Sequence, residues 1–220
     1  MRNKIIKQIT KALASRTSFF LREISIQIYL ADYFIKTNLY DNVFVEYHIP
    51  KKLIPDYPWS DKIDIDIVLE KNGKYFPIEI KYKTKQQILP LMIFGQDENI
   101  CLGKQGAQND GCYFFLKDVK RIEMCEELFI NVERGIVLFM SNDPSYQIPP
   151  SKADFEYAQF STHQGRYIPA NSLLSWNKKI KTKEPKNKNM NKDISILLKY
   201  DYTIDWIPLK NIPEHYYILL

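Results

Sequence analysis

The sequence contains little of what several common kinds of site require. Its three cysteines, Cys101, Cys112 and Cys125, form an odd, widely spaced set without a C-x-x-C pair, which argues against both a disulfide framework and a zinc site. The G-x-S-x-G elbow of the α/β-hydrolases is absent, and so is the phosphate-binding loop of the P-loop nucleotide hydrolases. We therefore expect neither of these two kinds of active site.

The sequence also lacks the long apolar stretches that direct a chain to a membrane. No apolar run approaches the roughly 18 residues that span a bilayer. The first seven residues are basic, but they lack the apolar stretch and the small-residue cleavage site of a signal peptide. These absences predict a cytoplasmic protein with no membrane partner.

Hydrophobic and aromatic residues, in contrast, are plentiful. They make up 45% and 14% of the 220 residues, which is enough to pack one large core. We expect a core formed by residues 1–150 and a C-terminal extension, residues 151–220, whose strands pack back on that core. The two parts should belong to the same domain.

The net charge of +5 comes from one segment. Residues 178–192 contain seven lysines and a single acidic residue, so the remainder of the chain is close to neutral. Such a run is typical of a solvated loop, although it can also bind phosphates without sequence preference. The net charge alone is therefore weak evidence for a polyanionic partner.

A helical pattern over residues 18–36 places a carboxylate on a face that should be buried. Thr17 or Ser18 would cap the start of this helix. The helical neighbours of Glu23 are mostly apolar, with the polar Gln27 among them. A buried carboxylate is costly unless a partner compensates its charge. Glu23 is therefore either half of a buried salt bridge or part of a site.

The remaining pattern predicts a mixed α/β fold, in which a central sheet is flanked by the Glu23 helix and by a second helix. Asn72-Gly73 is a strong signal for a two-residue hairpin turn, and we expect this hairpin at the middle of the sheet. The expected strands are residues 42–48, 62–70, 74–83, 136–140, 194–206 and 216–220, and the second helix is residues 112–128. The last strands should return the C-terminus to the sheet.

The hairpin turn also predicts which residues face one another. With a two-residue turn, Asp66 faces Glu79 and Asp64 faces Lys81. These four side chains should share one face, and apolar side chains should fill the other. The apolar set is Ile63, Ile65, Ile67, Phe76, Ile78 and Ile80. Pro77 cannot donate to the ladder, so a bulge there would shift the register by one residue.

Two opposed carboxylates destabilise a ladder unless their charge is neutralised. A divalent cation between Asp66 and Glu79 would remove the repulsion, and hard oxygen ligands suit Mg²⁺. Lys81 would lie beside the cation, where an amine can hold or help deprotonate an attacking water and stabilise charge on a phosphate. The alternative is an ordinary half-exposed hairpin with a cross-strand pair between Asp64 and Lys81.

The order of these features resembles the PD-(D/E)XK, or restriction-endonuclease-like, superfamily. The resemblance depends on the helix with Glu23, the strand Asp66-Ile67-Val68-Leu69, the hairpin, and Glu79-Ile80-Lys81. Ile65 stands where the family has proline before the aspartate, which leaves Asp64 as a rival metal ligand. Further stretches resemble uncharacterised bacterial proteins, some of them endonuclease-like: residues 113–123, 141–146, 163–166 and 200–206.

The resemblance implies a restriction-endonuclease-like fold and cleavage of DNA phosphodiesters by direct attack of water. The catalytic residues would be Asp66, Glu79 and Lys81, and Glu23 would join the two acids in binding Mg²⁺ or Mn²⁺. Auxiliary roles would fall on Asp64, Gln27 and Lys83, and nucleic acid would contact Lys83, Lys85, His163 and Arg166. For His163 and Arg166 the alternative is a structural loop. For the whole protein the alternative is a catalytically silent nuclease-like fold that binds nucleic acid or protein. The sequence does not decide whether the protein is a homodimer.

Overall fold

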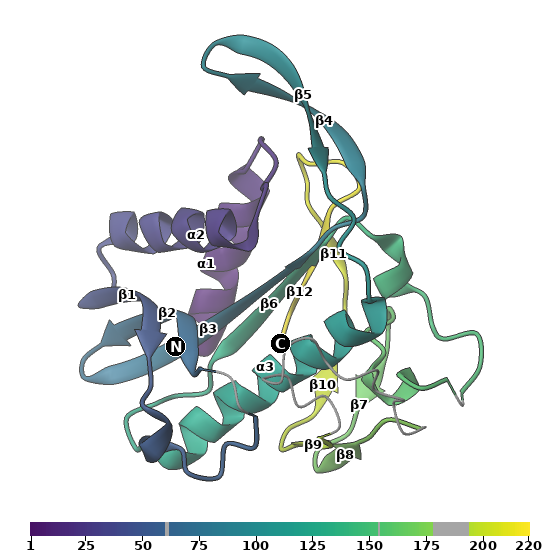
Figure 1. The fold of residues 1–220 in the computed structure, drawn as a ribbon. Coiled ribbons are helices and arrows are strands. Elements are labelled where there is room, and N and C mark those ends of the chain that lie inside the picture. The colour runs from purple at the N-terminus through teal and green to yellow at the C-terminus, as the bar shows by residue number, and fades with distance from the viewer. Residues whose placement is uncertain (60–61, 154, 178–193) are drawn as a thin grey trace.

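The computed structural model describes residues 1–59, 62–153, 155–177 and 194–220 and places them in a mixed α/β arrangement (Figure 1). The lysine-rich segment, residues 178–192, lies outside the described residues. In the described part of the chain, no helix has both the length and the apolar composition needed to cross a membrane.

A six-stranded sheet forms the centre, in the order β1-β2-β3-β6-β12-β11. β3 and β6 are parallel and all other neighbours are antiparallel, so the sheet is mixed. The strands in this order are Asn42–His48, Asp64–Lys71, Lys74–Lys83, Ile136–Ser141, Tyr216–Leu219 and Ile207–Pro208. β3 is one of the two central strands, whereas β2 lies next to the edge strand.

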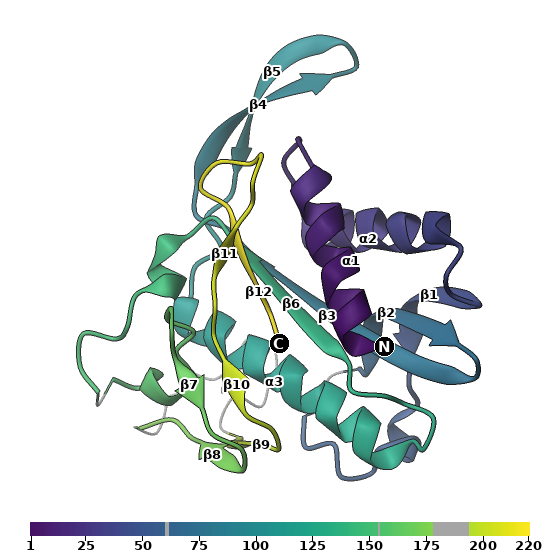
Figure 2. The ribbon, with the colours of Figure 1, turned by 180° about the vertical axis from the view of Figure 1, so that it is seen from behind.

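Helices cover both faces of this sheet (Figures 1 and 2). α1 (Arg2–Ser15) and α2 (Glu23–Thr37) pack on one face, over the side chains of β3, β6 and the hairpin end of β2. α3 (Gln108–Leu128) packs on the other face, in a core that also contains residues of the C-terminal segment. The carboxyl-terminal strand β12 pairs with β6, so the C-terminus returns to the sheet as expected.

Smaller elements surround this core. β4 (Gln87–Ile93) and β5 (Gln96–Leu102) form a hairpin that stands away from the body, and we call it the arm (Figures 1 and 2). The other short elements are β7 (Tyr167–Ile168), β8 (Ser172–Leu174), β9 (Ile196–Leu198), β10 (Tyr202–Thr203), and the 3-10 helices Lys51–Leu53, Pro144–Gln147 and Ala158–Phe160. The expected strand over residues 194–206 is therefore wrong. It is divided between β9, which pairs with β8, and β10, which pairs with β7.

The predicted strands 42–48 and 74–83 have the observed bounds, but α2 begins five residues later than expected. Its N-cap is Arg22, which has an extended backbone and no side-chain cap bond. Residues 18–22, which were expected to be helical, lie outside the helix. Arg16 contacts this segment, because its Nε donates to the Ser18 carbonyl at 2.8 Å and its guanidinium stacks on Phe20. α1 and the arm are not anticipated from the sequence pattern.

The hairpin register is confirmed from Lys71↔Lys74 to Ile67↔Ile78, and Pro77 faces Val68 without a shift. Beyond Ile67 the ladder stops, so the predicted pairings of Asp66 with Glu79 and of Asp64 with Lys81 are both wrong. The predicted face is also wrong in part, because Ile65 packs on the α3 side and Ile67 on the α1–α2 side.

The cause lies at Asp66, which is unpaired in the ladders on both sides of β2. The β1 ladder continues from Val45↔Ile67 to Tyr47↔Ile65 and omits Glu46, whose φ is 50°. The regular alternation of side chains is therefore broken at Asp66. A gap opens there between β2 and β3.

Candidate functional site

Asp66 lies in the gap where β2 separates from β3. Its Oδ2 accepts the backbone N–H of Ile80 at 2.6 Å, a donor that β2 no longer uses. Its own carbonyl oxygen accepts from Gln27 Nε2 at 2.7 Å, and the same nitrogen donates to Glu46 Oε1 at 2.8 Å. The buried Gln27 thus satisfies the polar atoms that the break in the ladder exposes.

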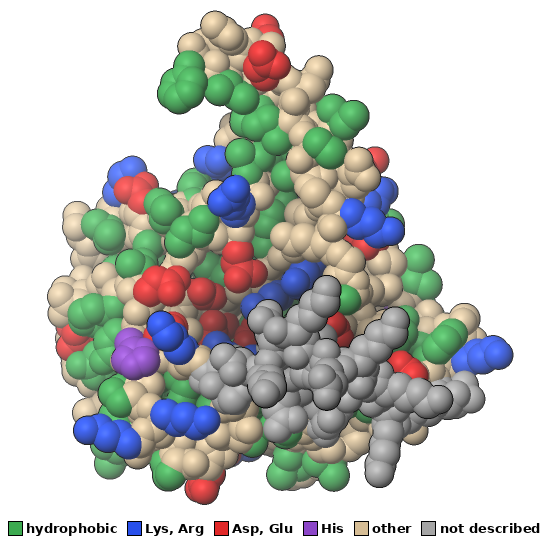
Figure 3. Space-filling model, viewed as in Figure 1, with side chains coloured by type: hydrophobic (Ala, Val, Ile, Leu, Met, Phe, Trp, Pro, Cys, Tyr) green, Lys and Arg blue, Asp and Glu red, His purple; other side chains and the backbone are tan. Residues whose placement is uncertain are grey.

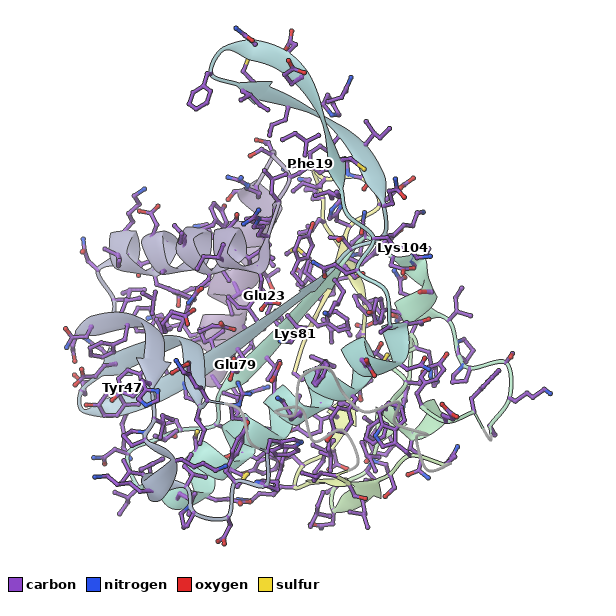
Figure 4. The ribbon with its side chains drawn as sticks, in the orientation of Figure 1. Phe19, Glu23, Tyr47, Glu79, Lys81 and Lys104 are labelled. Atoms are coloured by element: carbon purple, nitrogen blue, oxygen red, sulfur yellow. The ribbon has the colours of Figure 1, made fainter. Side chains whose placement is uncertain are left out.

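Glu79 and Lys81 project from β3 toward α3, and each is met by an oppositely charged side chain. Arg121 Nη1 lies 2.7 Å from Glu79 Oε1, and Lys81 Nζ lies 3.1 Å from Asp118 Oδ2. All four side chains are mostly buried between the sheet and the helix. Figure 4 shows Glu79 and Lys81 on β3 above α3, with Glu23 on the other side of the strand.

Glu23 is the first residue of α2 rather than the centre of a buried helical face. Its side chain is 40% exposed, and Oε2 accepts the backbone N–H of Tyr82 at 2.7 Å. Oε1 lies 4.0 Å from Lys81 Nζ. The position suits a carboxylate, because the N-terminus of a helix carries partial positive charge. Glu23 and Asp66 therefore line the same free edge of β3, at Tyr82 and Ile80.

The electrostatics differ between the two central acids. Burial raises the pKa of Asp66 to about 9, and the Glu79 carboxyl and Glu23 add to the increase. Burial also raises the pKa of Glu79, but Arg121 opposes that shift. Burial would lower the pKa of Lys81, yet Asp118, Glu23 and Glu79 raise it above its usual value. Four carboxyl groups thus surround two basic groups, and the raised pKa of Asp66 keeps that carboxyl protonated at neutral pH in the metal-free protein.

This donor chemistry fits a divalent cation. Asp66 and Glu79 are adjacent oxygen donors whose repulsion a cation would relieve, and Mg²⁺ is often held by one or two carboxylates with water filling its other positions. Among the described residues, no three His, Cys, Asp or Glu side chains are already gathered as a metal site. Glu79 is turned to Arg121, and Glu23 to the Tyr82 amide.

Figure 3 shows acidic side chains gathered in a hollow at the middle of this face of the molecule, with basic side chains beside them. A separate cavity of about 480 Å³ lies between the β1–β2 edge and the C-terminal end of α3. Its lining is mainly apolar and includes Ile65, Val68 and Phe129 but none of the acids described above. The candidate site is therefore the hollow and not the cavity.

The remaining predicted residues have other surroundings. Asp64 is bound to His48, whose Nδ1 lies 2.6 Å from Oδ1, so it points to β1. Lys83 is half-buried, and burial together with nearby Lys81 lowers its pKa. Lys85 is exposed, and its backbone N–H donates to Asn142 Oδ1 at 2.8 Å.

His163 and Arg166 belong to a loop outside the cluster. His163 Nδ1 lies 2.9 Å from Ser161 Oγ. Arg166 donates to the backbone carbonyls of Ser161 and, at 2.6 Å, Gln159, and burial lowers its pKa to about 10. These contacts fit the structural-loop alternative, because they use the guanidinium to fold its own loop.

Two residues at the site, Asp118 and Glu46, are not anticipated as site residues from the sequence, whereas for Arg121 the sequence leaves open a pair with Asp118 or a contact with the site. The spacing of Asp118 and Arg121 favours a pair along one helix. That pair exists at 3.6 Å, but the contact of Arg121 with Glu79 is shorter. The sequence could have indicated Asp118 and Arg121, because both charged residues fall among the apolar, buried positions of α3. Glu46 gives no such signal, since only the break in the β1–β2 ladder brings it to Gln27.

Comparisons with known proteins give no match for this chain among family models, curated proteins or solved structures. A function must therefore be inferred from the chemistry of the site.

Proposed function

We propose that the protein is a metal-dependent nuclease that cleaves DNA phosphodiester bonds by direct attack of water, on a restriction-endonuclease-like fold. The observation that carries the proposal is the meeting of the Asp66 and Glu79 carboxyl groups with the Lys81 amine at the gap between β2 and β3. Two acids and a lysine in this arrangement can hold a cation, a water molecule and a phosphate together.

Asp66 and Glu79 would hold the cation, and Glu23 stands close enough to Lys81 to orient it. When bound, Mg²⁺ or Mn²⁺ supplies Lewis acidity and neutralises charge on the phosphate. Lys81 keeps its proton at neutral pH, because three carboxylates surround it. It therefore acts as a hydrogen-bond donor that holds a water or a phosphate oxygen, rather than as a base.

Arg121 adds a second role in this proposal. Its guanidinium contacts Glu79 at 2.7 Å, on the same side of β3 as Lys81. If Glu79 turned to a cation, Arg121 would keep its contacts with Asp118 and Tyr57, and its planar fork would match the phosphate oxygens. Asp118 would keep Lys81 in position meanwhile.

The test is a cleavage assay on single-stranded, double-stranded and branched DNA and on RNA, with Mg²⁺ or Mn²⁺ and with a chelator. We expect cleavage of a DNA substrate that stops on chelation. Lys81→Ala should reduce turnover by about 100-fold or more with little change in cation affinity, measured by calorimetry. Lys36→Ala, at an exposed ion pair on α2, is the matched control and should retain full activity.

The second candidate is a catalytically silent fold that binds nucleic acid or protein. The observation that favours it is the internal pairing of the site, since Glu79 is held by Arg121 and Lys81 by Asp118. A wild-type protein that binds no divalent cation and cuts none of the four substrates would make this candidate the better one.

A further inference from the structure

The arm has features that its own fold does not require. β4 and β5 pair only with each other among the described strands, and a lone two-stranded ribbon is marginally stable in water. Ile88, Met92 and Phe94 are exposed along it. Phe94 occupies the first position of the two-residue turn with a φ of 48°, a conformation that is unfavourable for a bulky side chain. A fully exposed aromatic side chain in such a turn contributes nothing to the folded monomer.

The root of the arm, in contrast, is firmly attached to the body. Asn142, at the end of β6, accepts from the Lys85 amide at 2.8 Å and donates to Gln87 Oε1 at 2.7 Å. The two chains at the root are joined by Thr84, whose Oγ1 donates to the Gly103 carbonyl at 2.7 Å. The arm is therefore presented at a fixed place, with its apolar tip in solvent (Figures 1 and 2).

The charge of the arm argues against nucleic acid as its partner. Residues 86–103 contain Asp97 and Glu98, both exposed, and no lysine or arginine. A phosphate backbone would be repelled along this ribbon, because nucleic-acid affinity depends on basic side chains. An apolar, acidic arm fits instead a protein surface that is apolar and flanked by basic residues.

The chain itself carries such a surface. Ile24, Ile28 and Ile35 are exposed along one side of α2, at a spacing that aligns them on the helix. Exposed Arg22 stands at the start of this stripe, and Lys36 near its end forms an ion pair with Asp32 at 2.6 Å. Figure 3 shows hydrophobic side chains both on the arm and over α2, on the same face of the molecule. Within the described residues, no hydrogen bond or ion pair joins the arm to α2.

We propose that the arm of one copy docks on the Ile24–Ile28–Ile35 stripe of a second copy, and that the exchange is reciprocal. Each chain then supplies one apolar arm and one apolar stripe, so a twofold dimer buries both surfaces of both chains. Asp97 and Glu98 would lie near the partner's Arg22. The inference is independent of the proposed nuclease activity.

The test is the molar mass in solution, measured by sedimentation over a range of protein concentrations. The wild type should form a dimer that dissociates on dilution. Phe94→Asp and Ile28→Glu should each weaken association by roughly 100-fold or more, because each variant affects both contacts of the dimer. Ile148→Glu is the matched control, since Ile148 is 60% exposed against 61% for Ile28, and it should leave the dimer unchanged. Circular dichroism should confirm that all three variants are folded.

A mixture of the two interface variants tests the reciprocal exchange. The arm of the Ile28→Glu chain and the stripe of the Phe94→Asp chain are both intact, so the mixture should associate more tightly than either variant alone. A mixture that associates no more tightly than either variant alone would overturn the proposal, as would a wild type that is monomeric at all concentrations. So would a Phe94→Asp variant that loses nucleic-acid binding while its molar mass is unchanged.

Discussion

Asp66 and Glu79 occupy neighbouring positions but have different electrostatic partners. Glu79 has Arg121 at 2.7 Å, whereas Asp66 is stabilised mainly by the Ile80 amide and is repelled by Glu79 and Glu23. Neutralising one acid or the other should therefore affect the stability of the metal-free protein in opposite directions.

Asp66→Asn should leave the free energy of unfolding of the metal-free protein unchanged or raise it, because it removes a repelled buried carboxyl. Glu79→Gln should lower it by about 3 kcal/mol, because the buried Arg121 loses its nearest charge partner. Repulsion across the hairpin, considered alone, predicts stabilisation by Glu79→Gln, and the Arg121 pair reverses that expectation. Urea denaturation measures the free energy of unfolding of both variants. Equal effects of the two substitutions would contradict the different electrostatic partners given to Asp66 and Glu79. Both variants should abolish cation-dependent cleavage.

The raised pKa of Asp66 makes a prediction about pH. Its folded-state pKa of about 9 exceeds that of an unfolded aspartate, about 3.9, so the folded protein keeps a proton that the unfolded chain releases. The resulting stability is fully present below the unfolded pKa and is lost as pH rises through the folded pKa. In the presence of a chelator, the melting temperature of the wild type should fall relative to that of Asp66→Asn between about pH 5 and pH 9. Parallel curves for the two proteins would contradict this.

At the scale of elements, the site depends on how closely β3, β6 and α3 approach one another. β6 pairs with β3 from Ile136 onward, and Gly135 comes directly before it. A Cβ on Gly135 would overlap the Pro77 carbonyl oxygen and lie 2.7 Å from Ile122 Cγ2. The absence of a side chain at Gly135 therefore allows the chain to enter β6 in close contact with Pro77 of β3 and Ile122 of α3.

Gly135→Ala should destabilise the protein by about 2–3 kcal/mol, because the backbone of β3 and the buried Ile122 must move to accommodate the methyl group. Gly103→Ala is the matched control, since a Cβ there would have no atom within 4 Å. Thermal denaturation of the two variants measures the difference. Similar midpoints for the two would show that the packing at Gly135 can relax.

At the scale of the whole molecule, the C-terminal segment belongs to the main core. The cluster on the α3 face joins Ile65 of β2 and Phe139 of β6 to Trp206, Ile218 and Leu220. The described residues should therefore unfold together as one domain.

Ile218→Ala should lower the free energy of unfolding by about 2–4 kcal/mol, because Ile218 is fully buried in that cluster. Tryptophan fluorescence and far-ultraviolet circular dichroism should report the same single transition in the wild type and in the variant. Leu173→Ala is the control, since Leu173 is 62% exposed and its loss should change stability by less than about 0.5 kcal/mol. Two separate transitions would indicate that the C-terminal segment is an independent unit.

Local signals in the sequence were sufficient for the central hairpin. Asn72-Gly73 and the alternation on each side predicted β3 with its observed bounds and the register from Lys71 to Ile67. The sequence also predicted α3, although the helix begins at Gln108 rather than at residue 112, and it predicted the return of the C-terminus to the sheet. It did not predict α1 or the arm. The acids and the lysine of the candidate site were also proposed from the sequence. Charged side chains in strands whose other residues are mostly apolar are unusual, and this pattern indicated a site.

The tertiary structure decided what surrounds those residues. At Asp66 the β2–β3 ladder stops and the β1–β2 ladder skips one pair, and the polar atoms there are bound by Gln27, which also contacts Glu46 and is distant from Asp66 in the chain. The partners of Glu79 and Lys81 come from α3, about forty residues further along the chain. A sequence pattern reports the period of one element, whereas the protonation state of a buried acid depends on the charges that packing brings within a few ångströms. The identity of the acids was therefore set by the sequence, and their electrostatic environment was set by the fold.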